Sequence, residues 1–401
     1  MGAERLRVSL DVTAVPARPV GAGQYTLQLA RALSPRPDLD LVVVARRGDR
    51  ARWAGVAPEA GLVATAPERR PLRLAWEQVG LPSLLNRQAV AVHHGPHYTM
   101  PERSKVPAVV TVHDLSFFEE PEWHERSKVW LFTRAIKVAA RRAAVVVCPS
   151  QATADQLVRW CQVDAQVVVA HHGVDLDRFR PSEPSPGSDV ALLSALPTPA
   201  GSRVSLTDGP PFLAFVGTLE PRKDVPTLVR AFTQVAERHP DVRLVLAGGA
   251  GWGASQVEEA VAASGVGDRI IRTGYLPDEV IPALFRSAVA VVYPALYEGF
   301  GLPALEALAC GAVVVTTSGS AMEEVAGDAA ILVPPGDAAA LGGALESVLD
   351  GPDPDPGRRQ RGLEIAARHT WAASADRHME AYRLAAGKGP VGPERSSDPV
   401  G

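Results

Sequence analysis

Short apolar runs rich in β-branched residues recur through the first half of the chain, and amphipathic stretches separate them. The runs are Val8–Val15, Leu41–Ala45, Ala89–Val92, Val106–Val112, Ala143–Cys148 and Val167–Ala170. Between them, the spacing of apolar residues predicts helices at Tyr25–Leu33, His124–Arg142 and Gln151–Cys161, the last capped by Ser150. Strands that are apolar on both faces and alternate with helices are typical of a parallel sheet covered on both sides. The pattern therefore predicts a doubly wound α/β domain.

The range Pro181–Pro211 interrupts this alternation. It is rich in Pro, Ser and Gly and shows no pattern of a helix or strand, so we expect the domain junction there. Strands are expected again at Phe212–Gly217, Leu244–Ala247, Ile270–Gly274, Ala288–Tyr293, Ala312–Thr316 and Ala330–Val333. Helical patterns follow at Asp224–Arg238, Gln256–Ala263, Asp278–Arg286, Leu302–Ala309, Ser320–Ala326, Ala338–Leu349, Arg358–His369 and Trp371–Ala385.

The second half thus predicts a second doubly wound domain. We expect one domain over residues 1–190, another over 211–370, and a frayed tail over 386–401. Ligands of open α/β sheets bind beyond the carboxyl ends of the strands, so two such domains that face each other form a cleft. Catalytic and ligand-binding residues are therefore expected at the carboxyl ends of the strands.

Composition narrows the function classes. The chain has 401 residues, 46% hydrophobic and 21% charged, and its net charge of −4 argues against a nucleic-acid binder. Residues 1–200 carry 24 Lys and Arg against 20 Asp and Glu, and residues 201–401 carry 17 against 25, so the halves stand at +4 and −8. Cys148, Cys161 and Cys310 have neither disulfide nor zinc-ligand spacing, and no apolar run is long enough to span a membrane. We expect a soluble protein of the reducing cytoplasm.

The densest candidate site is the segment from Glu298 to Glu306, which follows a predicted strand and opens a predicted helix. Gly301 permits tight backbone, and the amides of Phe300, Gly301 and Leu302 precede the helix, where an anion can sit. Two carboxylates beside an anion site suit a sugar phosphate. Acidic residues that merely favour the helix dipole are an equally good explanation of the pair alone.

A second candidate follows strand Phe212–Gly217. Gly217 ends the strand, and Arg222 and Lys223 come directly before the next helix. Two adjacent cations at this edge can neutralise a diphosphate and stabilise it as a leaving group. A solvated basic turn is the alternative.

The first half contributes weaker signals. Gly21 and Gly23 follow the first strand, and a plain turn is as good an explanation as a phosphate loop. His113 ends a strand, where it can bind a sugar hydroxyl, although a buried structural histidine is favoured on this fact alone. The groups His93-His94-His97 and His171-His172 lack metal-ligand spacing, so structural or cleft-lining roles are favoured for them. We expect no metal and no bound cofactor.

Helix His124–Arg142 carries a basic aromatic stripe. Its members are Arg126, Trp130, Arg134, Lys137 and Arg141, opposite Phe132, Ile136 and Ala139. Such a face suits anionic lipid or a phosphorylated acceptor, and an ordinary solvated face is favoured over it. Peripheral contact with the inner face of a membrane is therefore left open.

Together these motifs resemble the retaining glycosyltransferases of family 4, which have the GT-B fold, and the likeness runs from Val8 to about Ala385. It is strongest in FVGTLEPRKDVPTLVRAF, in TGYLPDEVIPALFRSAVAVVYPALYEGFGLPALEALACG, and in the VHD and HHGVD segments. The pair Glu298 and Glu306, eight positions apart, combined with Arg222-Lys223 is highly specific, whereas either motif alone is less so.

The resemblance implies residue roles. Glu298 would bind hydroxyls of a donor hexose, Glu306 the ribose, and Arg222 with Lys223 the diphosphate, joined by the amides of Phe300, Gly301 and Leu302. The loop Thr273-Gly274-Tyr275 would lie near the base, Gly23 near the phosphate or sugar, and His113 near the anomeric centre. The last helix, Trp371–Ala385, would cross back to the first domain. Gln24 departs from related sequences, which often have arginine there, so the acceptor contacts stay open.

The sequence therefore predicts transfer of a hexose, of mannose or glucose type, from a nucleotide-diphosphate sugar to a hydroxyl acceptor. A glycan, a glycolipid, a polysaccharide or a small metabolite would fit as acceptor. The alternatives are a non-catalytic two-domain binder of nucleotide sugars and, among enzymes of the same fold, a nucleotide-sugar epimerase or a phosphorylase.

Overall fold

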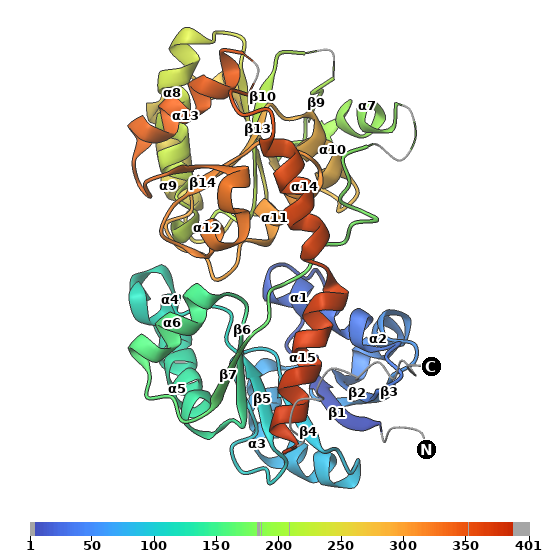
Figure 1. Cartoon of the computed structure of the whole chain (residues 1–401). Helices are drawn as coiled ribbons and strands as arrows, with labels where there is room; N and C mark the ends of the chain where they lie inside the picture. The colour runs from blue at the N-terminus through green and yellow to red at the C-terminus, as the bar shows by residue number, and fades with distance from the viewer. Residues whose placement is uncertain (1–4, 183–184, 186, 208, 352, 388–401) are drawn as a thin grey trace, which may run out of the picture.

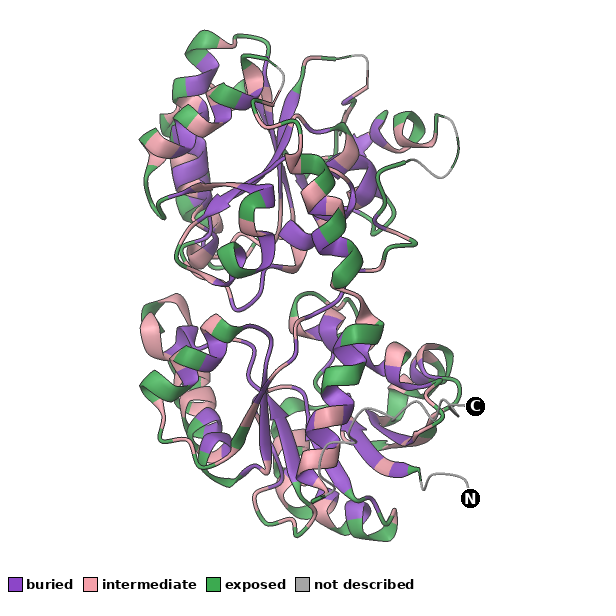
Figure 2. Cartoon of the chain, in the orientation of Figure 1, coloured by how far each residue is buried: buried purple, intermediate pink, exposed green. Residues whose placement is uncertain are grey.

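The computed structural model describes residues 5–182, 185, 187–207, 209–351 and 353–387. Two parallel sheets, each covered by helices, lie one above the other in Figure 1. Both sheets are buried, as the purple strands of Figure 2 show, because their central strands are apolar on both faces. The predicted fold class is therefore confirmed.

The first sheet has the strand order β3-β2-β1-β4-β5-β6-β7, with every pairing parallel. Its strands are β1 (Leu6–Asp11), β2 (Leu39–Arg46), β3 (Gly61–Ala66), β4 (Val92–Gly95), β5 (Ala108–Thr111), β6 (Val145–Cys148) and β7 (Gln166–Val169). Around it lie α1 (Ala22–Leu33), α2 (Arg50–Val56), α3 (Arg70–Arg87), α4 (Ser116–Glu119), α5 (Arg126–Arg142) and α6 (Gln151–Trp160). Ser150 caps α6 as predicted, because its hydroxyl oxygen accepts from the amide of Thr153.

The sequence pattern did not predict four of these elements, which are β3, α2, α3 and the four-residue helix α4. Strand β3 is the edge of the sheet and is mostly half-buried or exposed, so it lacks the strong apolar run of a central strand. Helix α3 has Pro82 in its interior, and few of its side chains are buried. Helix α2 buries only Trp53.

The second sheet has the order β12-β11-β10-β13-β14-β15, again all parallel. Its strands are β10 (Phe212–Val216), β11 (Arg243–Ala247), β12 (Ile270–Gly274), β13 (Ala290–Tyr293), β14 (Val314–Thr317) and β15 (Ala330–Val333). The helices are α8 (Val225–Arg238), α9 (Ala254–Ala263), α10 (Val280–Ser287), α11 (Leu302–Ala309), α12 (Ala321–Ala326), α13 (Ala338–Leu349) and α14 (Arg358–Arg368).

The range 181–211 is not free of regular structure, and that expectation was wrong. It contains α7 (Ser188–Leu193), β8 (Leu196–Pro197) and β9 (Arg203–Val204). Leu193, Leu196 and Leu206 belong to the buried core of the second sheet, and Arg286 of α10 donates to both carboxylate oxygens of Asp189. Contacts with the buried core stabilise these short elements. They were not predicted because the surrounding Pro and Gly residues give no helix or strand pattern. The domain bounds 1–190 and 211–370 remain a proposal.

The last helix, α15 (Trp371–Ala385), crosses to the first sheet, where it packs beside α1 and against β5, β6 and β7 (Figure 1). Met379, Ala381 and Tyr382 join the core that includes β1 and α1. Buried polar contacts also hold it, because the Tyr25 hydroxyl lies 2.7 Å from His378 Nε2, and the Tyr382 hydroxyl 2.8 Å from His94 Nδ1.

Within the residues that the structure describes, no helix is long and apolar enough to cross a membrane. The expected frayed tail lies, from residue 388 onward, outside the described residues. Cytoplasmic location stays a prediction.

Candidate active site between the two sheets

A cavity of about 460 Å³ lies where loops from the carboxyl ends of both sheets meet. From the first sheet it takes Gly21 after β1, His113 after β5 and His172 after β7. From the second it takes Gly217 after β10 and Tyr275 after β12. The cavity therefore occupies the place where open α/β sheets bind ligands.

Most of the predicted site residues line this cavity. They are Gly21, His113, Gly217, Arg222, Lys223, Tyr275, Glu298, Phe300, Gly301, Leu302 and Glu306. Three others do not. Gly23 lies inside α1, where a Cβ would come 3.1 Å from the Pro19 Cβ, so its small size serves packing. Thr273 is buried and donates its hydroxyl hydrogen to the Gly274 carbonyl oxygen at 3.1 Å, and Gly274 carries a φ of +67° as β12 ends.

Arg222 and Lys223 converge on Glu298, which lies 75 and more residues away in the chain. Arg222 Nη1 donates to Glu298 Oε2 at 2.7 Å, and Lys223 Nζ donates to the other oxygen of the same carboxylate. Burial lowers the pKa of the Lys223 ammonium well below its usual value, and the charge of Arg222 acts in the same direction. The site thus holds two cations and one carboxylate in a poorly solvated position.

The turn that carries these cations is unusual in its backbone. Asp224, directly after Lys223, has a φ of +46°, a conformation that residues other than glycine seldom adopt. It lies between the 3-10 turn Pro221–Lys223 and helix α8. Strained backbone of this kind often occurs at functional sites, where the surrounding structure holds it.

The start of α11 presents the predicted amides. In the described residues, no hydrogen bond uses the amides of Phe300, Gly301 or Leu302. Gly301 has a φ of +95°, and a Cβ there would overlap the sulfur of Met322. Free amides at the positive end of a helix are suited to an anion.

Glu306, one turn into α11, lies on the cavity wall. Burial raises the pKa of its carboxyl from 4.5 to about 8, while Arg178 opposes this increase. Among the described residues no hydrogen bond reaches the carboxyl group. It is therefore free to bind hydroxyl groups of a ligand.

His113 enters the cavity from the first sheet. Its Nε2 lies 2.7 Å from the carbonyl oxygen of Pro96, and burial lowers the pKa of the ring. Because a carbonyl oxygen only accepts, Nε2 carries the hydrogen in the neutral ring, and Nδ1 is left as an acceptor. The rings of Tyr25 and His172 pack around it, at centroid distances of 5.0 and 6.0 Å.

Sequence analysis missed several residues of the cavity. Gly248 and Gly249 follow β11, and a Cβ at Gly248 would overlap the carbonyl group of Gly217. A double glycine directly after a predicted strand is a signal that could have found them. Asp114 and Trp371 also line the cavity, and only the folded chain brings them there. Of the pair His171-His172, for which a structural or cleft-lining role was expected, His172 lines the cavity.

The first sheet also holds the loop that carries Glu298. The hydroxyls of Ser150 and Thr153, at the start of α6, donate to the carbonyl oxygen of Gly299 at 2.7 and 3.1 Å. The backbone amide of Leu115 donates to the Tyr297 hydroxyl at 2.8 Å. Glu324 of α12 in turn accepts from the amides of Gln151 and Ala152 at 2.7 and 2.9 Å, and lies 2.9 Å from His171 Nε2.

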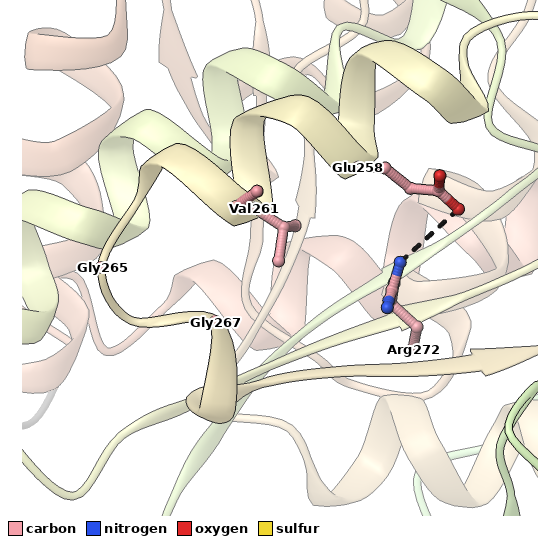
Figure 3. Close-up of a pocket in the computed structure, with 6 residues that line it drawn as sticks. Glu258, Val261, Gly265, Gly267 and Arg272 are labelled. Carbon is pink, nitrogen blue, oxygen red and sulfur yellow. Dashed lines mark ion pairs between the residues drawn. The ribbon is translucent and has the colours of Figure 1, made fainter.

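A second hollow, of about 560 Å³, lies between α9 and β12. Figure 3 shows its lining, in which Arg272 and Glu258 form an ion pair with N and O 3.7 Å apart. It contains none of the predicted site residues and lies at β12, the edge strand of the second sheet. The cavity between the sheets is therefore the candidate site.

Comparisons with known proteins agree with this arrangement. Residues 202–368 match the family model described as glycosyl transferases group 1, and residues 19–178 match that of glycosyltransferase family 4. The chain is 29% identical over 301 residues to the O-antigen chain mannosyltransferase B of Escherichia coli, covering 73% of this chain and 74% of that protein. It is 32% identical over 295 residues to a D-inositol 3-phosphate glycosyltransferase of Salinispora tropica, covering 70% of this chain and 58% of that protein.

Solved structures share the fold. Sucrose-phosphate synthase from Thermosynechococcus elongatus superposes with a TM-score of 0.76 at 23% identity, covering 94% of this chain and 98% of that one. Anabaena HepE in complex with UDP and glucose gives a TM-score of 0.69 at 17% identity, covering 94% and 99%.

Proposed function

This chain belongs to glycosyltransferase family 4, whose members are retaining enzymes of the GT-B fold, and we propose that it transfers a hexose to a hydroxyl acceptor. The sugar comes from a nucleotide-diphosphate donor. The observation that carries the proposal is the convergence of Arg222 and Lys223 on Glu298 at the cavity. The hexose is of mannose or glucose type, and a glycan, a glycolipid or a small metabolite accepts it.

Donor binding rearranges the charges of this centre. The diphosphate takes the place of the Glu298 carboxylate between Arg222 and Lys223, and its negative charge favours the protonated form of the buried lysine. Glu298 is thereby released to accept hydrogen bonds from hydroxyls of the hexose. The free amides of Phe300, Gly301 and Leu302 support the phosphates, and Glu306 binds the ribose hydroxyls.

The transfer step needs no nucleophile from the protein. The bond between the anomeric carbon and the diphosphate breaks with its electron pair on the phosphate oxygen, and the acceptor oxygen bonds to the same face of that carbon. The proton of the acceptor hydroxyl passes to the departing diphosphate, which the two cations stabilise. His113, with Nδ1 as an acceptor, orients a hydroxyl of the hexose near the anomeric centre.

The curated relatives support mannose as the first sugar to test. One is an O-antigen mannosyltransferase, although the 2-deoxystreptamine glucosyltransferase of Streptomyces kanamyceticus is 28% identical over 314 residues, covering 77% of this chain and 78% of that protein. A thermal-shift screen over UDP, GDP and ADP sugars identifies the donor, because a ligand that binds only the folded chain raises its unfolding temperature.

Variants then test the roles. Lys223→Ala and Glu298→Ala should abolish transfer while the fold, followed by circular dichroism, is kept. Full activity in both would contradict the proposal. Donor binding without turnover over a broad acceptor panel would favour the alternative of a binding protein, and a new nucleotide sugar formed without any acceptor would favour an epimerase.

Peripheral membrane contact is proposed through the basic stripe of α5. Trp130 is 69% exposed there, while Arg134 is paired with Glu102 at 2.5 Å and Arg141 donates to Gln162. The test is co-sedimentation with anionic vesicles over a range of salt concentrations. Absence of binding at low salt would overturn this part.

A further inference from the structure

A small cavity of about 110 Å³ lies beside the donor cleft, and Arg222 is the one predicted site residue among its lining residues. It is formed by loops of both halves and is lined by Trp123, His124, Glu125, Lys128, Glu220, Pro221, Arg222 and Trp252. We call it the side cavity. Glu220 and Arg222 line both the side cavity and the donor cleft, so the two spaces meet at the proposed diphosphate site.

The position of the side cavity fits an acceptor. In same-face transfer, the acceptor oxygen approaches the anomeric carbon from the side of the leaving diphosphate. If Arg222 holds that diphosphate, then the space on the other side of Arg222 is where the acceptor can reach the reacting carbon. This step rests on the proposed function.

Two tryptophans supply apolar surface at this position. Trp252 is 63% exposed, yet the loop that carries it is tightly held. Gly253 donates its amide hydrogen to the Leu219 carbonyl oxygen at 2.9 Å, and a Cβ at Gly251 or Gly253 would come within 3.0 Å of atoms of residues 218–221. A large indole presented to solvent on a rigid loop is typical of a binding surface. Trp123 closes the 3-10 turn Pro121–Trp123 on the opposite half.

The charges of the side cavity are balanced within it. Lys128 pairs with Glu125 at 3.1 Å, and Arg222 pairs with Glu220 at 2.8 Å. The His124 ring is held by the Ser116 hydroxyl at 2.8 Å from Nε2, and burial lowers the pKa of this ring. Such a lining offers hydrogen-bond partners and ring faces but no excess cation for a phosphate.

From this lining we propose that the side cavity is the acceptor subsite and that it binds an uncharged sugar ring, packed against Trp252 and Trp123. Apolar C–H faces of the ring lie on the indoles, and its hydroxyls bond to the side chains of Glu125, Lys128 and Glu220. The acceptor is thereby a neutral saccharide rather than a phosphorylated polyol.

The test compares tryptophan variants on neutral and charged acceptors. The probes are methyl α-D-mannopyranoside and methyl β-D-glucopyranoside, with glucose 6-phosphate as the anionic probe, and the donor is the sugar nucleotide found by thermal shift. For Trp252→Ala and Trp123→Ala, KM for a methyl glycoside should rise about tenfold, while the donor dissociation constant stays within about twofold of wild type. Trp252→Phe should recover part of the loss. Trp130→Ala is the matched control, since this exposed tryptophan of α5 lies outside the cavity.

Each other outcome overturns the proposal. Unchanged KM in both alanine variants, transfer only to glucose 6-phosphate, or no transfer by the wild type to either methyl glycoside would show that the side cavity is not a neutral-sugar site. Failure of the wild type to bind any nucleotide sugar would contradict the proposed function itself, and the two failures are therefore distinguishable.

Discussion

The backbone of Gly299 lies directly against the carbonyl group of His113, so closely that a Cβ at position 299 would overlap its oxygen. His113 ends the region of β5 in the first sheet, whereas Gly299 belongs to the loop before α11 in the second. This contact ties the loop that carries Glu298 to His113 across the cleft. Glycine is required here by close approach rather than by an unusual φ.

Gly299→Ala should therefore displace the Glu298 loop from the first sheet. We expect kcat/KM to fall by about 100-fold, because small misplacements of a reacting group are costly, while the unfolding temperature changes little. Steady-state kinetics with circular dichroism check this. Gly343→Ala in α13, where a Cβ meets nothing within 4 Å, is the control, and equal activity of the two variants would contradict the prediction.

Glu306→Gln should make stability less dependent on pH. The folded pKa of Glu306 is raised from 4.5 to about 8, so between these values the folded chain keeps a proton that the unfolded chain releases. The free energy of unfolding then falls as pH rises through this window, and the uncharged variant escapes this loss. The variant should gain in unfolding temperature over wild type from pH 5 to pH 9. A difference that is the same at both pH values would refute the assignment.

Glu324 is expected to hold the two halves together. Burial opposes its ionisation, but hydrogen bonds from His171 and from the amides of Gln151 and Ala152 lower the pKa of its carboxyl. Glu324→Ala removes these bonds across the cleft, and we expect a larger radius of gyration by small-angle scattering and a decrease of about tenfold in kcat/KM. Glu323→Ala is the control on the same helix, because among the described residues Glu323 accepts only from the nearby Gly319 amide. Identical scattering and kinetics in both variants would contradict the prediction that Glu324 holds the two halves together.

Tyr382→Phe should weaken the packing of α15 against the first sheet. The Tyr382 hydroxyl lies 2.8 Å from His94 Nδ1 in a fully buried position, and its loss leaves that nitrogen without a partner. An unfolding free energy lower by about 1–3 kcal/mol is expected in urea titrations. The more exposed Tyr275→Phe should cost less than about 0.5 kcal/mol. A Tyr382→Phe variant as stable as wild type would contradict this account of α15.

The well-buried elements of the fold could be predicted from the sequence, and the more exposed ones could not. Strands such as β10 and β14 were foreseen because central strands of a parallel sheet are apolar on both faces. Strand β3 and helix α7 were not, because an edge strand and a six-residue helix carry little periodic signal and are held by tertiary contacts. In the site, Glu298 and Lys223 were found by their place at strand ends, while Trp252 and Glu324 carry no local sign of their neighbours.

The sequence by itself determined the doubly wound architecture, its strand ends and the chemical groups placed there, since apolar periodicity and turn residues are local properties of the chain. Tertiary structure alone decided which of those groups meet. The convergence of Arg222 and Lys223 on Glu298, the contact of Gly299 with His113 and the side cavity beside Arg222 all join segments far apart in the chain. Such contacts depend on how the two buried sheets and their loops pack against each other. The local periodicity of apolar residues does not encode contacts between segments far apart in the chain.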